Sequence, residues 1–210
     1  MTKAFIVEGL SNDHLEKIDL ALSPGECVGV TGPSGSGKSL LLRALADMDP
    51  FEGHLSLDGR AAHSMPAPRW RRQVALLPAI SAWWDDTVGP HFMGPHVKGL
   101  VGAEYHALGV PPEVAAWEIR RLSSGERQRL ALLRILALRP RVLLLDEPTA
   151  NLDKANTRRA ESLIRDYGSR HAAALLWVSH DVEQLQRLCT RAYTMEAGRL
   201  TPLFDGKGVA

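Results

Sequence analysis

The sequence is poor in cysteine, in aromatic residues, in net charge and in long apolar segments. Only 2 of its 210 residues are cysteine, and Cys27 and Cys189 stand far apart. We therefore expect free thiols in a reducing compartment, and no disulfide scaffold or cysteine metal site. The longest apolar runs, Val142–Leu145 and Ala172–Val178, are far shorter than the roughly 18–20 residues of a membrane-spanning helix. A soluble, intracellular protein is expected.

The charge balance excludes a strongly basic surface. There are 25 basic and 24 acidic residues, which gives a net charge of +1. Direct nucleic-acid binding is therefore not expected, because it requires a basic patch that neutralises phosphates. The apolar content of 45% is ordinary for a globular chain. A chain of this length buries about 70% of its unfolded surface, enough for one real core.

Apolar strands alternate with helical segments along most of the chain. Strands are predicted at Ala4–Glu8, Ile18–Leu22, Cys27–Val30, Gly53–Gly59, Val74–Leu77, Val142–Leu145 and Ala174–Val178. Helices are predicted at Leu40–Ala46, Gly125–Leu138, Lys154–Arg170 and Asp181–Cys189. This order indicates a parallel sheet with helices on its faces. Residues 79–123 depart from it, because their tryptophans, prolines and glycines and a helical pattern around Pro112–Leu122 predict a small, mostly helical insert.

A glycine-rich loop joins the predicted strand Cys27–Val30 to the following helix. It matches the pattern G-x-x-x-x-G-K-[ST] and consists of Gly32, Pro33, Ser34, Gly35, Ser36, Gly37, Lys38 and Ser39. Small residues let successive backbone N–H groups surround an anion, and the helix N-terminus faces the same point. Lys38 supplies a mobile charge for the β- and γ-phosphates, and Ser39 supplies a hydroxyl for Mg²⁺. The loop therefore predicts a nucleotide phosphate site.

Polar residues end two other predicted strands. Asp146 and Glu147 follow Val142–Leu145, and His180 follows the strand that ends at Val178. Carboxylates at the end of a buried strand must reach a polar edge, since ionised groups are costly inside a core. In a doubly wound sheet that edge also holds the phosphate loop. Asp146 suits a Mg²⁺ ligand, and Glu147 suits a base that takes a proton from an attacking water.

A third segment of small residues precedes the helix Gly125–Leu138. It contains Ser123, Ser124, Gly125 and Glu126. One interpretation is a helix cap by Ser123 or Ser124, with Glu126 in the first turn. The other is a second phosphate-binding helix N-terminus. Position in the sequence does not choose between them.

Taken together and in this order, these motifs resemble the ATP-binding cassette of ABC proteins. The loop 32–39 is similar to the Walker A motif, Leu122–Glu126 to the LSGGQ signature, and Val142–Asp146 to Walker B. Glu147 stands at the position of the catalytic glutamate, Asp153 in the D-loop, and His180 at the switch histidine. The short insert and the stretch Leu176–His180 look most like small bacterial cassettes of the metal-export type.

The resemblance implies an α/β P-loop NTPase fold. Its parts are a RecA-like parallel core, an N-terminal antiparallel β part and a small helical subdomain. The subdomain spans residues 79–125, and residues 1–78 and 126–210 form the remainder. It further implies an ATPase with ATP and Mg²⁺ as cofactors, in which two chains bind two nucleotides head to tail. Ser123–Glu126 of one chain then faces the phosphate loop of the other. A separate membrane permease is the second partner, and the chain is peripheral on the cytoplasmic face.

Three positions depart from the family pattern. Ser124 replaces the first signature glycine, and Ala79 stands where the family has a glutamine that contacts Mg²⁺ and water. Alanine neither donates, accepts nor coordinates, so slower or differently coupled hydrolysis is expected. Between Gly9 and Ile18 the aromatic residue that stacks on adenine is missing, and His14 is the nearest substitute. We therefore expect GTP to be accepted nearly as well as ATP.

Two alternatives accompany the transport hypothesis. One is a soluble ABC ATPase that acts on nucleic acid or ribosomes, although the chain lacks a long coiled-coil insertion and a second cassette. The other is a slow regulatory ATPase, suggested by Ala79. Trp83 and Trp84 either anchor a partner or fill the core of the insert, and the sequence supports both interpretations.

Overall fold

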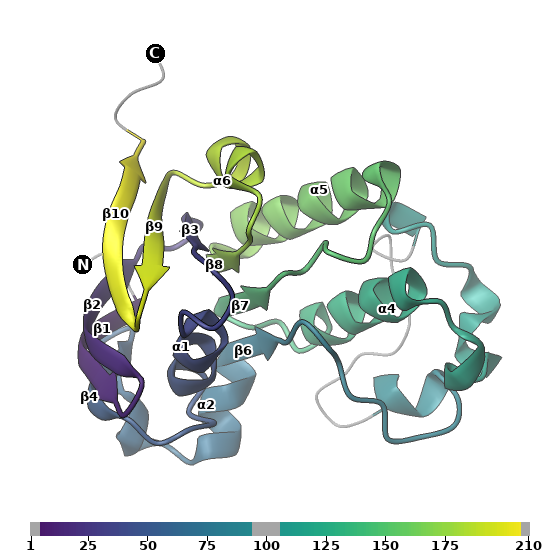
Figure 1. The fold of residues 1–210 in the computed structure, drawn as a ribbon. Coiled ribbons are helices and arrows are strands. Elements are labelled where there is room, and N and C mark those ends of the chain that lie inside the picture. Colours follow the sequence, from purple (N-terminus) through teal and green to yellow (C-terminus); the bar gives the residue numbers. More distant parts are fainter. Residues whose placement is uncertain (1–4, 94–105, 207–210) are drawn as a thin grey trace.

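The computed structural model describes residues 5–93 and 106–206, which form two β-sheets with helices around the larger one (Figure 1). The strands are β1 (Phe5–Asn12), β2 (Leu15–Leu22), β3 (Cys27–Thr31), β4 (Glu52–Leu57), β5 (Arg60–Ala61), β6 (Val74–Leu77), β7 (Val142–Asp146), β8 (Ala174–Val178), β9 (Arg191–Glu196) and β10 (Arg199–Asp205). The α-helices are α1 (Lys38–Leu45), α2 (Ala67–Gln73), α4 (Ser124–Leu136), α5 (Lys154–His171) and α6 (Val182–Leu188). Among these residues, no helix is long and apolar enough to cross a bilayer.

The larger sheet has the order β10-β9-β3-β8-β7-β6, and its four strands β3, β8, β7 and β6 are parallel neighbours. Their carboxyl ends therefore meet at one edge. In this register Leu77 pairs with Leu145, and Asp146 pairs with Val178. The segments after β3, β8, β7 and β6 are thus brought side by side, although they lie far apart in the sequence. The smaller sheet, β2-β1-β4-β5, is antiparallel.

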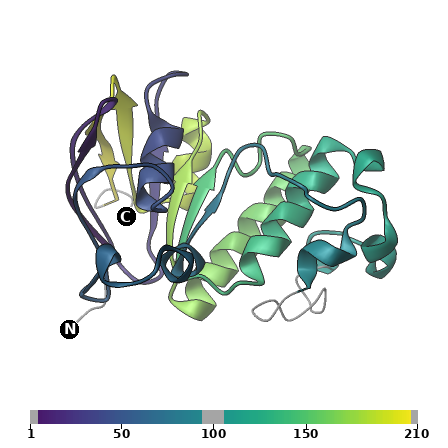
Figure 2. The ribbon, with the colours of Figure 1, turned by 90° about the horizontal axis from the view of Figure 1, so that it is seen from below.

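Alternate residues of the parallel strands face two separate apolar clusters. Leu143 and Leu145 of β7 belong to a cluster with residues of α4, α5 and α6, whereas Val142 and Leu144 belong to one with α1, α2 and the antiparallel sheet. Both faces of β7 are therefore buried, which explains why its sequence is continuously apolar. Figure 2 shows α4 and α5 lying along one side of the sheet. The predicted α/β class with a parallel core and an antiparallel β part is confirmed.

The described parts of the insert, residues 79–93 and 106–123, contain 3-10 helices where the sequence indicated a longer helix. In place of one helix around Pro112–Leu122 there are two short 3-10 helices, Pro112–Ala116 and Ile119–Arg121. They are separated by extended residues, and Glu118 forms an isolated bridge with Thr87. A further 3-10 helix covers Gly89–Phe92. The bridge to Thr87 and the hydrogen bond from the Ile119 N–H to the carbonyl oxygen of Asp86 keep the chain extended between the two 3-10 helices, so they do not join into one helix. The predicted strand residue Ala4 lies outside the described residues.

Helix α2 and strands β5, β9 and β10 have no counterpart in the sequence prediction, and β9 and β10 are adjacent in the chain. The last two form a hairpin whose turn contains Ala197 and Gly198, both with positive φ, of 45° and 81°. Two such residues are typical of a two-residue hairpin turn. Only two of the six residues of β9 are buried, and they do not alternate regularly with exposed ones. The sequence pattern therefore did not predict this strand.

The two cysteines are free thiols, as predicted, but they are neighbours. Their Sγ atoms lie 3.2 Å apart, and both side chains are buried. The contact with Cys27, together with burial, raises the pKa of the Cys189 thiol well above its usual value. Both side chains are core groups, buried away from solvent. Their proximity comes from the pairing of β3 with β9, which follows Cys189 directly.

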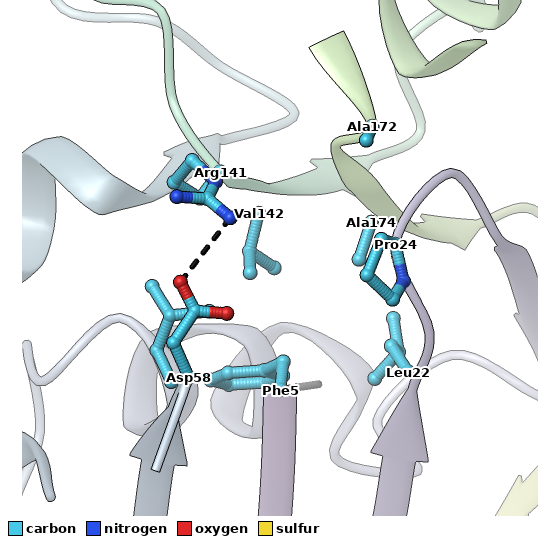
Figure 3. Close-up of a pocket in the computed structure, with 9 residues that line it drawn as sticks. Phe5, Leu22, Pro24, Asp58, Arg141, Val142, Ala172 and Ala174 are labelled. Atoms are coloured by element: carbon cyan, nitrogen blue, oxygen red, sulfur yellow. Dashed lines mark ion pairs between the residues drawn. The ribbon is translucent and has the colours of Figure 1, made fainter. Parts of the chain in front are cut away.

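A small hollow lies at the amino-terminal ends of β7 and β8, on the opposite edge from the strand ends described above. Figure 3 shows Arg141 and Asp58 across it, with Phe5, Leu22 and Val142 lining its walls. The Arg141 and Asp58 side chains form an ion pair of 3.2 Å. The hollow encloses about 10 Å³, the space of about one water molecule. The hollow lies between the two sheets, and its volume is too small for a ligand.

Candidate functional site

The glycine-rich loop leads from β3 into α1, as the sequence predicted. Gly37, with φ of 106°, precedes the first helical residue, Lys38. Nζ of Lys38 donates to the carbonyl oxygens of Gly32 and Pro33, at 2.8 and 2.7 Å. An ammonium group has three donors, so one remains for a phosphate oxygen. The lysine charge therefore lies directly over the backbone of the loop.

Two loop glycines are required by contacts that the sequence did not reveal. A Cβ at Gly32 would collide with the carbonyl oxygen of Met195 in β9, and Gly32 has a φ of 142°. A Cβ at Gly37 would lie 3.2 Å from side-chain atoms of both Leu15 and Met195. The β9–β10 turn also contacts the loop, since the N–H of Gly198 donates to the carbonyl oxygen of Ser36 at 3.0 Å. Met195 and Gly198 thus support the loop, and only the tertiary structure identifies them.

The end of β7 meets the start of α1. The hydroxyl of Ser39 donates to Oδ2 of Asp146 at 2.7 Å, and Asp146 is largely buried. A hydroxyl and a carboxylate are hard oxygen ligands of the kind that Mg²⁺ prefers, and Mg²⁺ usually keeps several waters beside one or two protein ligands. The donor set therefore fits this ion.

Glu147 and His180 lie together at the same edge. Nδ1 of His180 is 3.2 and 3.1 Å from the two carboxylate oxygens of Glu147. A carboxylate only accepts, so this contact requires the proton on Nδ1. Glu147 has a positive φ of 48°, and its N–H donates to the carbonyl oxygen of Val178 at 3.1 Å. A non-glycine residue in this region is strained, and such strain is common at functional sites.

The segment 123–126 forms a capping box at the N-terminus of α4. The hydroxyl of Ser123 accepts from the N–H of Glu126 at 3.2 Å, and the Glu126 carboxylate accepts from the N–H of Ser123 at 2.8 Å. The hydrogen bonds from Ser123 hold the pKa of Glu126 below its usual value. The capping interpretation is therefore confirmed, with Ser123 rather than Ser124 as the cap. In the described residues no hydrogen bond or ion pair joins this segment to the phosphate loop, and α4 lies away from α1 (Figures 1 and 2).

Asp153 caps the next helix, α5. Its Oδ1 accepts from the N–H of Asn156 at 2.8 Å. The residue closes the loop that begins at Glu147, so the D-loop position is placed on the same segment as the candidate base. The contacts show a helix cap, and a contact with a second chain stays a prediction.

Ala79 follows β6 and lines a hollow with Ser124, Gln128 and Asn151.

The two neighbouring tryptophans, Trp83 and Trp84, have different environments. Trp83 is partly buried against the apolar cluster that joins insert residues to α4 and the parallel sheet, whereas Trp84 is 69% exposed. The guanidinium of Arg134 lies 4.6 and 4.8 Å from their ring centroids. The interpretation as a core residue therefore fits Trp83, and the interpretation as an exposed partner anchor fits Trp84. Ile80, four residues before Trp84, is 90% exposed.

The residue that the sequence analysis proposed for base stacking, His14, is exposed in the turn between β1 and β2. Its carbonyl oxygen lies against Gly198 of the β9–β10 turn. The β1–β2 turn therefore lies next to the β9–β10 turn, which itself contacts the phosphate loop through Gly198 and Ser36. Base selectivity stays a prediction.

The ends of β3, β7 and β8 thus bring together a lysine, an oxygen pair suited to Mg²⁺ and a carboxylate paired with an imidazole. Lys38 can bind phosphate oxygens, Ser39 and Asp146 can hold Mg²⁺ beside them, and Glu147 can accept a proton from water. Such a site supports phosphoryl transfer to water through positioning and charge, without a covalent intermediate.

Comparisons with known proteins point in the same direction. The family model described as ABC transporter matches residues 15–150. The chain is 37% identical over 201 residues to an aliphatic sulfonates import ATP-binding protein of Paracoccus denitrificans, covering 93% of this chain and 78% of that protein. It is 36% identical over 213 residues to a hemin import ATP-binding protein of Pseudomonas entomophila, covering 92% and 83%. Both relatives are named for import, so the resemblance to metal-export cassettes is not confirmed.

Solved structures share the fold. An ATP binding subunit of an ABC transporter matches with a TM-score of 0.79 at 22% identity, covering 95% of this chain and 90% of that one. A bacterial ABC exporter with ATP bound matches with a TM-score of 0.82 at 24% identity, covering 95% of this chain and 38% of that one. At these identities the likeness shows the architecture alone.

Proposed function

This chain belongs to the ABC transporter family, and we propose that it binds and hydrolyses ATP to power transport through a separate membrane permease. The observation that carries the proposal is the juxtaposition of Lys38, the Ser39–Asp146 pair and the Glu147–His180 pair at one sheet edge. Relatives named as import ATP-binding proteins favour transport over an action on nucleic acid or ribosomes.

The chain's own residues would divide the reaction between binding and proton transfer. Lys38 and the backbone N–H groups of residues 34–39 hold the β- and γ-phosphates, and the α1 N-terminus adds a favourable dipole. Glu147 takes a proton from the attacking water, and His180 orients the Glu147 carboxylate through Nδ1. Ser39 and Asp146 would hold Mg²⁺, which when bound neutralises charge on the phosphate oxygens.

Two chains are proposed to close head to tail on two nucleotides, with Ser123–Glu126 of one facing the phosphate loop of the other. The small, exposed residues at the N-terminus of α4 support this role, since a helix N-terminus favours an anion. The exposed Ile80 and Trp84 of the segment after β6 are proposed to contact the permease, because tryptophan is enriched among the residues that dominate binding at interfaces. The chain would then lie peripherally on the cytoplasmic face of the membrane.

The proposed division into subdomains follows from the same arrangement. Residues 79–125 connect β6 to α4 and are proposed as a helical subdomain. Residues 1–78 and 126–210 are proposed as the β-subdomain and RecA-like core. The described part of the connecting segment extends away from both sheets, which supports this division (Figure 2).

Co-isolation from native membranes tests the transport proposal. A tagged Glu147→Gln chain, extracted with ATP, should carry a polytopic membrane protein in stoichiometric amount. The same variant extracted without nucleotide is the control and should retain less of that partner. Recovery of the chain alone, or with ribosomes or DNA, would overturn the transporter assignment.

Restoring the family glutamine tests the departure at position 79. We expect Ala79→Gln to change ATP turnover, or its stimulation by the permease, by roughly 2- to 10-fold, since one well-placed hydrogen bond contributes about 0.5–1.5 kcal/mol. Steady-state phosphate release with and without the permease measures both. Ala82→Gln, on the same connecting segment, is the matched control. Unchanged turnover and unchanged stimulation in Ala79→Gln would refute a role for this position.

A further inference from the structure

A buried polar network joins the loop after Glu147 to helices α5 and α6. The side-chain amide of Gln184 donates to Oγ1 of Thr149 at 2.9 Å and to Oε1 of Glu161 at 2.7 Å. All three side chains are buried. Arg187 completes the network with hydrogen bonds of 2.6 and 3.3 Å to Glu161. Thr149 lies two residues after Glu147, and Gln184 four residues after His180.

The geometry fixes the orientation of the Gln184 amide. Both of its N–H donors are used, and the reversed amide would direct Oε1 at a carboxylate oxygen of Glu161. The carboxylate is in turn fixed by the Arg187 guanidinium. Gln184, Thr149 and Glu161 are buried, so a shift of any of the three breaks a hydrogen bond out of reach of water, which is costly. Gln184 therefore holds Thr149 at a set distance from α6.

A second buried amide holds the same loop from the opposite side. Nε2 of Gln128, on α4, donates to the carbonyl oxygen of Pro148 at 3.1 Å. Pro148 and Thr149, the two residues after Glu147, are thus bonded to helices that begin after Ser123 and after Asp181. Glu147 itself has a strained positive φ, which persists only where the surroundings hold it.

We propose that Gln184 is a positioning residue: through Thr149, and with Gln128 opposite, it holds the backbone that presents the Glu147 carboxylate to His180 and to the attacking water. The inference rests on the proposed function, in which Glu147 is the base. Since Gln184 touches no reacting group in this role, its loss is expected to lower the turnover number and to leave ATP affinity unchanged.

Two variants break the link at different atoms. Thr149→Val removes only the accepting hydroxyl and keeps the shape of the side chain, and Gln184→Leu removes the amide. Gln186→Leu is the matched control, because Gln186 is exposed on the same helix. Hydrogen exchange of the peptide spanning residues 147–153 reads the loop directly, and phosphate release and equilibrium ATP binding give the turnover number and the affinity.

For both link variants we expect exchange in residues 147–153 to accelerate at least about tenfold, with β8 unchanged. The turnover number should fall roughly 10- to 100-fold, as small misplacements of catalytic groups do, with ATP affinity within about twofold. Thr149→Val keeps the test decisive if Gln184→Leu does not fold. Wild-type exchange and turnover in Thr149→Val would overturn the inference. A wild-type chain that hydrolyses no ATP with its permease would instead refute the proposed function. Hydrogen exchange of residues 147–153 would then still show whether the Gln184–Thr149 hydrogen bond holds the loop.

Discussion

Replacing Glu147 by glutamine is expected to lower ATP turnover by about 10²- to 10⁴-fold, the usual contribution of a general base. The amide keeps the size of the side chain but has no basic oxygen for a water proton. His180 Nδ1 can still donate to the amide oxygen, so the local geometry is retained. ATP binding should persist, because the phosphate contacts of Lys38 and the loop backbone are untouched, and the ATP-bound dimer should accumulate.

Phosphate release measures the loss of turnover, and light scattering with ATP measures the dimer. Glu113→Gln is a suitable control, since Glu113 is an exposed carboxylate in the insert. Wild-type hydrolysis by Glu147→Gln would show that another group accepts the proton. Loss of hydrolysis without an ATP-dependent dimer would leave Glu147 as the base and refute the head-to-tail arrangement.

Replacing Lys38 by alanine is expected to weaken ATP binding by roughly 10- to 100-fold, because hydrogen bonds to a charged group contribute about 1.5–3 kcal/mol. The variant loses the one charged side chain that bonds to the loop backbone, at Gly32 and Pro33, among the described residues. Those two carbonyl oxygens are also left without this donor. Hydrolysis should fall at least in proportion.

Equilibrium binding by calorimetry, at matched Mg²⁺, checks this expectation. Lys154→Ala removes an exposed lysine from the first turn of α5 and should bind ATP normally. A thermal melt confirms that both variants are folded. Undiminished affinity in Lys38→Ala would refute the assignment of residues 32–39 as the phosphate loop.

The elements that carry the site were predictable because their signals are local. β6 and β8 have the predicted bounds, and β7 extends the prediction by Asp146 alone. A strand buried on both faces is continuously apolar, and a loop of glycines followed by good helix formers has few alternative structures. The parallel order then places the polar residues after each strand at one edge.

The insert and the C-terminal hairpin were less predictable. The 3-10 helices after Pro111 contain residues that are compatible with an α-helix in isolation, but the bridge between Thr87 and Glu118 keeps the chain extended between them. Strand β9 is determined by pairing with β3 and β10, and its own alternation is weak. The contact between Met195 of β9 and Gly32 was therefore not predictable from the sequence either.

The sequence by itself determined the fold class, the glycine-rich loop between β3 and α1, and the strand-end positions of Asp146, Glu147 and His180. Those features depend on periodicity and on residues adjacent along the chain. Only the tertiary structure decided which groups touch: Ser39 with Asp146, Cys27 with Cys189, and Gln184 with Thr149 and Glu161. These partners are separated by up to 162 residues. A side chain's hydrogen-bond partner across such a distance depends on helix placement and register, which no local pattern encodes.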